Sequence, residues 1–239
     1  MNFTPVGSTR QTAGKKNIIS KLHHRHFKFN VITRTDTDID KTRSYIADVF
    51  KNRYGANLQN FLPIFLQMSR GEDIFGTVGV RKAEHSALFL EQYLKKTSEQ
   101  VVSEFFSKPV CRSQIIEIGN LVATRRGSSY LLFVVLAHIL QAAGFQWMLF
   151  TATQRVEQIV LKMRFSPVAL CAADPHCIED VDRQWGSYYH GNPRVMAGNL
   201  CAANAVIESH SFFEDLLSPY RQHLHSWAQQ IKEARMAMH

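Results

Sequence analysis

The sequence is short of cysteine, and this shortage excludes two classes of small, cross-linked protein. It has four cysteines in 239 residues and no CxxC pair, so we expect neither a disulfide framework nor a familiar zinc motif. The group Cys171, His176 and Cys177 can be imagined as metal ligands, but its spacing fits no known zinc pattern, and we expect no metal. The cysteines lie in or beside apolar runs and are expected to be buried, reduced thiols: Cys111, Cys171, Cys177 and Cys201.

The sequence also lacks an apolar segment long enough to cross a bilayer. The longest one, residues 130–137, is far shorter than the roughly 20 residues that a spanning helix needs, and it predicts a buried helix. The first 20 residues have no apolar core of the kind found in secretory signals. We therefore expect a cytoplasmic protein without a transmembrane segment, and association with a membrane surface stays open.

Acidic residues are missing from the first 34 positions, which hold seven of the 28 basic residues. The remainder is nearly neutral, with 21 basic against 20 acidic residues. The net charge of +8 is therefore a property of an N-terminal basic arm, which we place at residues 1–26. Such an arm is either a flexible, solvated extension or a contact for an anionic lipid, a nucleic acid or an acidic protein. No nucleic-acid recognition motif accompanies the charge, so we expect no specific nucleic acid.

The spacing of apolar residues predicts a single α/β domain over residues 27–202. The expected element order is β, α, β, β, α, β, α, β, α, β, β, α. The central strand, helix and strand indicate one parallel pair, and the preceding hairpin indicates antiparallel pairing. We predict a mixed, mostly antiparallel sheet flanked by helices, with a bent strand or hairpin at residues 186–200. Residues 203–239 are predicted to form a helical extension packed on the same domain. The expected strands are 27–33, 61–68, 75–81, 110–124, 145–151 and 167–171, and the expected helices are 36–53, 87–94, 97–106, 130–144 and 154–164.

A polar loop joins the strand at 110–124 to the apolar helix that follows it. A helix that begins at such a loop directs main-chain N–H groups and the positive end of its dipole toward an anion. Two arginines add charge, a glycine lets the backbone approach a ligand, and two serines can cap the helix or bind phosphate. An ordinary serine-capped turn has the same sequence, so both interpretations stay open. The loop consists of Arg125, Arg126, Gly127, Ser128 and Ser129.

Five short motifs give the chain a resemblance to a known family. They are Gly79–Arg81, Leu88–Leu94, Glu117–Leu121, Phe150–Thr153 and Trp185–Tyr189. In this order they resemble the thermostable hemolysin family, whose members are similar to GNAT acyltransferases and to acyl-homoserine-lactone synthases. The resemblance extends over about residues 28–200. It implies a GNAT-like fold and a site that binds the pantetheine arm of an acyl thioester.

The resemblance also implies roles for individual residues. Glu117 matches a glutamate of the lactone synthases and is a candidate base for an attacking amine, although a strand carboxylate paired with an arginine is the simpler interpretation. Asn120 stands where those enzymes carry an arginine, which argues against S-adenosylmethionine as a substrate. Tyr188, or its neighbour Tyr189, is a candidate acid for the leaving thiolate, and packing of this aromatic cluster is the alternative. The expected substrate-binding residues are Arg81, Asn120, Thr151 and Thr153, and the expected pantetheine-binding residues are Leu121, Val122 and the loop 125–129.

These residues predict an N-acyltransferase that moves a fatty acyl group from acyl-CoA or from an acyl-carrier protein to a small amine. Acyl-carrier proteins are acidic, so the basic arm or the paired arginines can dock one. The alternative takes the family name literally and makes the chain a membrane-active cytolysin. The basic arm supports that alternative by its attraction to anionic lipid. The absence of a predicted spanning segment argues against it.

Overall fold

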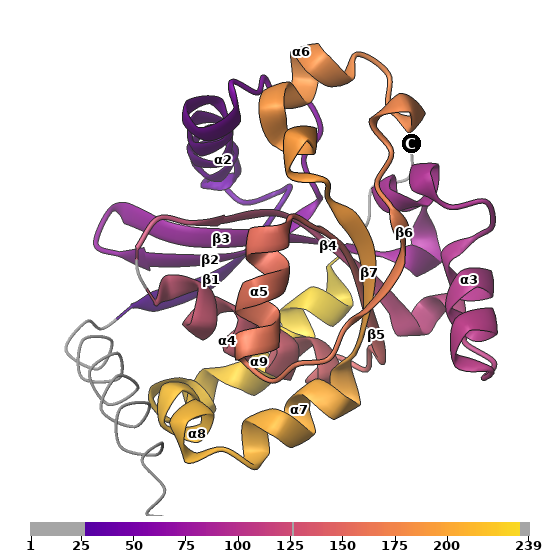
Figure 1. The fold of residues 1–239 in the computed structure, drawn as a ribbon. Helices are drawn as coiled ribbons and strands as arrows, with labels where there is room; N and C mark the ends of the chain where they lie inside the picture. The colour runs from indigo at the N-terminus through magenta and orange to yellow at the C-terminus, as the bar shows by residue number, and fades with distance from the viewer. Residues whose placement is uncertain (1–26, 126, 235–239) are drawn as a thin grey trace, which may run out of the picture.

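A computed structural model describes residues 27–125 and 127–234, so the predicted arm at 1–26 lies outside the described residues. Within them the chain forms one seven-stranded sheet in the order β1-β2-β3-β4-β5-β7-β6 (Figure 1). The pair β4–β5 is parallel, and the other neighbouring strands are antiparallel. The strands are β1 (Lys28–Thr33), β2 (Ile64–Arg70), β3 (Asp73–Lys82), β4 (Ile115–Ala123), β5 (Trp147–Ala152), β6 (Val168–Ala172) and β7 (Arg194–Asn199).

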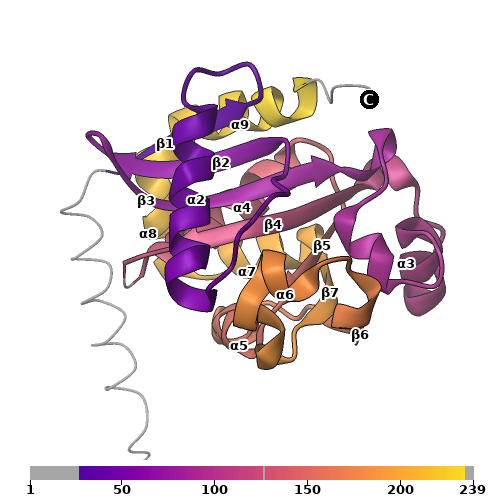
Figure 2. The same ribbon diagram turned by 90° about the horizontal axis from the view of Figure 1, so that it is seen from above.

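Helices cover both faces of this sheet. The α-helices are α2 (Ile39–Tyr54), α3 (Ser98–Phe106), α4 (Ser128–Ala142), α5 (Gln154–Lys162), α6 (Val181–Trp185), α7 (Leu200–Glu208), α8 (Ser211–Leu217) and α9 (Arg221–Glu233). Short 3-10 helices are η1 (Ala83–His85), η2 (Phe89–Tyr93), η3 (Arg112–Gln114), η4 (Pro175–Cys177), η5 (Gly186–Gly191) and η6 (Ser218–Tyr220). Helix α2 lies on one face, and α4 with α7, α8 and α9 lies on the other (Figure 2).

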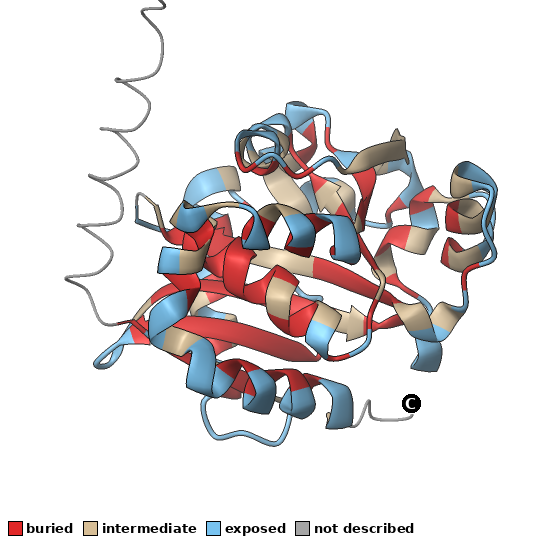
Figure 3. Cartoon of the chain, turned by 90° about the horizontal axis from the view of Figure 1, so that it is seen from below, coloured by how far each residue is buried: buried red, intermediate tan, exposed pale blue. Residues whose placement is uncertain are grey.

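Helix α4 is the centre of the core. Its residues are apolar on almost every side, which is typical of a helix that neighbours surround completely. The sheet covers one side of α4, and α7, α8 and α9 pack on the others. Figure 3 accordingly shows α4 and the strands buried, while the outer faces of the surrounding helices are exposed. The helix expected from the apolar run is thus confirmed, and it begins at Ser128 rather than at Tyr130.

The sheet opens at its centre, where the parallel pair ends. The pairing of β4 with β5 stops at Ile118 and Phe150, although both strands continue beyond that point. On its other side, β4 has a bulge against β3: Gly79 pairs with Gly119 and Thr77 with Val122. Asn120 and Leu121 therefore lie outside both ladders. Asn120 has φ +48°, a left-handed conformation that asparagine tolerates better than most residues.

The predicted fold class, a mixed and mostly antiparallel sheet flanked by helices, is confirmed. Of the bent strand or hairpin expected at residues 186–200, one strand is present at Arg194–Asn199. The hairpin is wrong, because Gly186–Gly191 forms a 3-10 helix. That strand pairs with β5 and β6 instead of folding back on itself. In the part of the chain that the structure describes, no helix combines the length and the apolar character needed to span a membrane.

The cysteines are not the buried thiols that their apolar neighbours suggested. Cys111, Cys177 and Cys201 are exposed, and Cys171 is half-buried. Cys111 precedes a short surface turn, and Cys201 lies on the outer side of the first turn of α7. An apolar neighbour in sequence does not bury a residue when the helix or turn points the two in different directions.

The core assignment predicts different costs for two leucine truncations. Leu132→Ala in α4 removes a fully buried side chain, and we expect a loss of about 2–5 kcal/mol in the free energy of unfolding. Leu161→Ala in α5 removes a side chain that is 52% exposed, and we expect about 0.5 kcal/mol or less. Urea denaturation monitored by tryptophan fluorescence measures both. Equal losses would contradict this core.

Candidate active site

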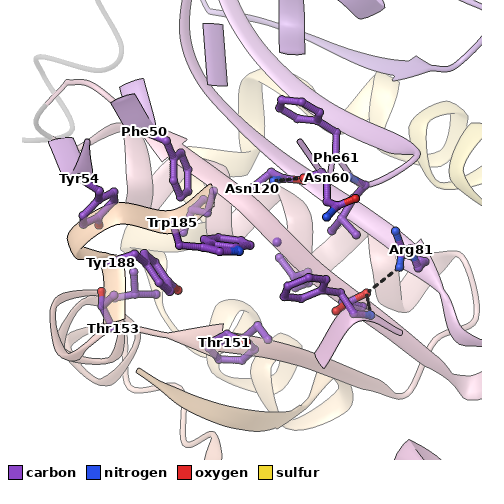
Figure 4. Close-up of a pocket in the computed structure, with 18 of the residues that line it drawn as sticks. Phe50, Tyr54, Asn60, Phe61, Arg81, Asn120, Thr151, Thr153, Trp185 and Tyr188 are labelled. Carbon is purple, nitrogen blue, oxygen red and sulfur yellow. Dashed lines mark hydrogen bonds and ion pairs between the residues drawn. The ribbon is translucent and has the colours of Figure 1, made fainter. Parts of the chain in front are cut away.

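One cavity lies where the sheet opens, between the ends of β4 and β5 (Figure 4). The space between its walls is about 1020 Å³ when the open solvent at its mouth is included. Residues from both faces of the sheet border it, because the gap between the strands joins the two sides. Its walls are Phe50, Arg53, Tyr54, Asn60, Phe61, Leu62, Arg81, Phe89, Tyr93, Glu117, Ile118, Gly119, Asn120, Leu121, Phe133, Phe150, Thr151, Thr153, Val156, Trp185, Tyr188 and Tyr189.

Strand β4 supplies the floor of the cavity, and its alternation explains which side chains reach it. Ile116 and Ile118 belong to the core cluster around α4, so Glu117 faces the opposite side of the sheet. The bulge at Asn120 then reverses the alternation, and Val122 packs in the cluster under α2. Leu121, in contrast, turns toward the α4 side and borders the cavity there. The bulge thus places polar and apolar groups of one strand around the same space.

Glu117 is the one acidic residue among the described residues that line the cavity. The residue is 3% exposed, and its two oxygens accept hydrogen bonds from main-chain N–H groups. Phe89 N lies 3.0 Å from Oε2 and Leu90 N lies 2.8 Å from Oε1. Burial raises the pKa of Glu117 above its ordinary value, against the lowering effect of Arg81 and of these two N–H groups. A carboxylate held in place with a raised pKa can accept a proton.

The segment that binds Glu117 is itself held by a partly buried ion pair. Glu91, inside η2, receives two hydrogen bonds from the Arg112 guanidinium at 2.6 and 2.9 Å. It also accepts from the main-chain N–H groups of Leu88 and Ser98, both at 2.8 Å. Arg112 further donates to the carbonyl oxygen of Ala83 at 2.7 Å. These bonds fix both ends of the turn that presents its N–H groups to Glu117.

Arg81 lies beside Glu117 at the end of β3. Its Nη1 is 3.9 Å from Glu117 Oε2 and 3.4 Å from the carbonyl oxygen of Ala87. Among the described residues these are the contacts found for its guanidinium, which has five donors. Arg81 borders the cavity (Figure 4) and can therefore bind an anionic group of a ligand. The structural interpretation of Glu117, a strand carboxylate paired with an arginine, thus finds its arginine in Arg81.

Asn120 connects the bulge to the loop that precedes β2. Its Oδ1 accepts a hydrogen bond from Leu62 N at 2.8 Å. Gly79, on the neighbouring strand, leaves the space for this contact, since an added Cβ would lie 2.9 Å from Leu62 Cβ and 3.3 Å from Asn120 Oδ1. Asn120 borders the cavity as expected, but its side-chain oxygen already accepts the hydrogen bond from Leu62 N.

Aromatic rings form the wall opposite Arg81 (Figure 4). Tyr188 packs against Phe50, Tyr54 and Trp185, with ring centroids 5.3–6.3 Å apart. Burial among these rings raises the pKa of Tyr188 far above its ordinary value. The hydroxyl therefore stays protonated at neutral pH, which suits it to donate a hydrogen bond more than to give up its proton.

A hydrogen-bonded pair of tyrosines borders the same cavity, and no sequence pattern predicts their pairing. The hydroxyls of Tyr93 and Tyr189 are hydrogen-bonded to each other, and burial raises the pKa of both. The resemblance offers Tyr189 as an alternative to Tyr188 for the leaving thiolate, and it includes Tyr93 only as part of the motif Leu88–Leu94. Both lie in aromatic segments far apart in the sequence, so their pairing could be found only from the fold. Thr151 and Thr153, expected at the substrate, also border the cavity.

The Arg-Gly-Ser loop lies away from this cavity. Of the expected pantetheine-binding residues, Leu121 borders it, and Val122, Arg125, Gly127, Ser128 and Ser129 do not. Arg125 stacks over the ring of Phe75 with its Cζ 4.4 Å from the centroid. Gly127 adopts φ +89° at the start of α4, and Ser128 Oγ is buried without a hydrogen-bond partner among the described residues. Arg126 lies outside the described residues, so the anion cradle stays a prediction.

Over 27–125 and 127–234, no three His, Cys, Asp or Glu side chains gather as metal ligands would.

Comparisons with known proteins identify the family and the fold. The sequence model of the family described as thermostable hemolysin matches residues 18–204, while no curated protein sequence matches the chain. The structure of FeeM, an N-acyl amino acid synthase from uncultured soil microbes, is 8% identical with a TM-score of 0.54, covering 75% of this chain and 93% of that one. The AHL synthase LasI is 14% identical with a TM-score of 0.50, covering 74% and 91%.

A third structure, the CoA-dependent acyl-homoserine lactone synthase BjaI with SAM and isopentyl-CoA, is 10% identical with a TM-score of 0.50. It covers 77% of this chain and 89% of that one. At such low identities these similarities establish the fold alone. The chain therefore has the GNAT-like fold that the resemblance implied.

The Arg112–Glu91 pair predicts a pH-dependent contribution to stability. Burial raises the pKa of Glu91, but the hydrogen bonds from Arg112, Ser98 and Leu88 outweigh it and lower the pKa to about 2. A lowered pKa in the folded state means that the contribution is complete above the ordinary pKa of 4.5 and is lost as the pH falls toward 2. We therefore expect Glu91→Gln to be less stable than the wild type at pH 6.

The same comparison at low pH provides the control. Urea denaturation should give a difference in unfolding free energy that shrinks steadily between pH 5 and pH 3, because Glu91 loses its charge there in the unfolded chain. Glu104→Gln, at an exposed ion pair with Lys96, should change stability little at either pH. A difference for Glu91→Gln that does not vary with pH would show that the ion pair has no electrostatic role.

Proposed function

The chain belongs to the thermostable hemolysin family, and we propose that it is an N-acyltransferase that moves an acyl group from a pantetheine thioester to an amine. The observation that carries this proposal is Glu117: a buried carboxylate with a raised pKa, fixed at the bottom of an open cavity. The fold shared with acyl-thioester-dependent enzymes supports it. The donor is acyl-CoA or an acyl-carrier protein, and the acceptor is a small amine.

The gap between β4 and β5 can hold the acyl-thioester donor. A thioester placed there lies along β4, beside the main-chain groups of Asn120 and Leu121 that belong to neither ladder. An N–H group in that position can bind the carbonyl oxygen as negative charge develops on it. The acyl chain then extends toward the apolar wall made by Leu121, Phe133 and Val156.

Glu117 suits the role of general base. The amine nitrogen attacks the carbonyl carbon and forms the new C–N bond, and its proton passes to Glu117 directly or through one water. Collapse of the tetrahedral intermediate breaks the C–S bond. The leaving sulfur takes a proton, so that the amide and a free thiol result and the carboxylate is restored when its proton leaves.

The tyrosines can stabilise the leaving thiolate. Tyr188 and Tyr189 border the cavity as protonated phenols, and a hydrogen bond from either one lowers the energy of a departing thiolate. Full proton transfer from such a weak acid is less favourable than a hydrogen bond. We therefore assign Tyr188 stabilisation of the thiolate, with solvent as the final proton source.

The printed descriptions of the structural neighbours indicate which amines to test first. LasI and BjaI are synthases of acyl-homoserine lactones, and FeeM is a synthase of N-acyl amino acids. The natural first panel is therefore a set of amino acids and S-adenosylmethionine, each offered with acyl-CoA and with acyl-carrier protein.

Substitution of Glu117 tests the proposal. Glu117→Gln keeps the shape and one oxygen acceptor but removes the base, and we expect thioester-dependent amide formation to fall about 10²–10⁴-fold. Release of free thiol and mass spectrometry of the product measure it. Glu104→Gln is the matched control, because that carboxylate is exposed on α3 and away from the cavity.

The pH profile gives a second readout of the same variant. Since the pKa of Glu117 is raised, the rate should increase with pH through an apparent pKa above the usual 4.5 of a glutamate. This increase of the rate with pH should be absent from any residual activity of Glu117→Gln. The proposal fails if the wild type forms no amide from any donor and amine, or if liposomes leak on addition of the purified protein without an acyl donor.

A further inference from the structure

Two opposite charges lie side by side in the cavity, and together they select a type of acceptor. Arg81 Nη1 and Glu117 Oε2 are 3.9 Å apart. In an α-amino acid the amine nitrogen and a carboxylate oxygen are separated by the α-carbon and the carboxyl carbon, and they lie about 3 Å apart. Such a molecule can place its amine at Glu117 and its carboxylate at Arg81 at the same time. A monoamine without an anionic group uses only one of the two sites.

Transfer of the amine proton to Glu117 increases the stabilisation that a carboxylate of the acceptor provides. When Glu117 accepts the proton of the amine, Arg81 loses its negative neighbour while it remains largely buried, with a side chain 21% exposed. An unpaired charge in such a place is costly. A carboxylate of the acceptor compensates for that loss through the planar donor fork of the guanidinium.

The aromatic wall begins beside the same carboxylate. Phe89 donates its main-chain N–H to Glu117, and its ring lies 5.5 Å from the ring of Trp185, centroid to centroid. Trp185 continues to Tyr188 at 5.3 Å. The indole Nε1 of Trp185 is buried without a hydrogen-bond partner among the described residues, and in Figure 4 its nitrogen end is turned toward the middle of the cavity.

A flat, apolar group packs favourably against rings arranged in this way. The rings line the cavity from Glu117 outward, so a side chain attached to the α-carbon of the acceptor extends along them. A phenyl, phenol or indole side chain covers this wall, whereas a methyl group leaves most of it uncovered.

We propose that the acceptor is an aromatic α-amino acid, with its carboxylate on Arg81, its amine at Glu117 and its ring on the wall formed by Phe89, Trp185 and Tyr188. This inference rests on the proposed acyltransferase function and narrows it to one substrate class.

A panel of four acceptors tests each part of the assignment. L-phenylalanine has all three groups, phenethylamine lacks the carboxylate, L-alanine lacks the ring, and S-adenosylmethionine carries a charged side chain in its place. With saturating acyl-CoA, or acyl-carrier protein if CoA is not used, we expect kcat/KM for phenethylamine about a hundredfold below that for phenylalanine. Alanine should be lower by about tenfold or more.

Variants of Arg81 test whether this residue causes the preference for an acceptor that carries a carboxylate. Arg81→Gln should abolish the advantage of phenylalanine over phenethylamine, and Arg81→Lys, which keeps the charge without the fork, should retain part of it. The ratio of the two substrates is independent of how much protein is folded. Arg221→Gln, at an exposed ion pair with Glu214 on the far helices, should keep the wild-type ratio.

The outcomes separate this inference from the function on which it rests. Amide formation with equal rates for phenylalanine and phenethylamine, or a preference for S-adenosylmethionine, overturns the acceptor assignment and leaves the acyltransferase intact. Absence of amide formation from every acceptor overturns the acyltransferase itself. Binding of 3-phenylpropionate, measured by calorimetry in the absence of a donor, should weaken in Arg81→Gln, and unchanged binding counts against Arg81.

Discussion

The parallel pairing between β4 and β5 ends at Ile118 and Phe150, and the site depends on this early end. A sheet that stayed paired would close the space between the two strands and leave no path from one face to the other. The bulge at Asn120 completes the opening, because it removes Asn120 and Leu121 from the β3 ladder as well. The contact from Asn120 to Leu62 holds this geometry. A local irregularity in one strand thus gives the molecule its cavity.

Glu117 has a structural role in the fold and, as we propose, a chemical role at the same position. Its oxygens bind the N–H groups of Phe89 and Leu90, which is the simple structural role of a buried carboxylate. The same bonds fix its orientation toward the cavity, while burial raises its pKa. The ion pair of Glu91 and Arg112 lies one layer farther out and stabilises the turn that carries those N–H groups. Catalysis as we propose it therefore depends on residues that no ligand touches.

Periodicity predicted the elements well because most of them have one apolar face. The buried α4 and the strand that carries Glu117 were expected from their apolar runs, and Arg81, Thr151 and Thr153 were expected at the site and border the cavity. The Tyr93–Tyr189 pair and the Arg112–Glu91 pair join segments that are distant in sequence, so no local pattern indicates them. The 3-10 helix Gly186–Gly191 was missed because its glycine and aromatic residues alternate loosely, as those of a strand do.

A structure of the protein with a stable donor analogue tests the central claim most directly. The analogue is an acyl-pantetheine in which a methylene group replaces the thioester sulfur, so that it binds but does not react. The account predicts its carbonyl group in the gap between β4 and β5, with the carbonyl oxygen at Asn120 or Leu121 and the carbon facing Glu117. An analogue bound elsewhere on the molecule, with this gap unchanged and empty, would contradict it.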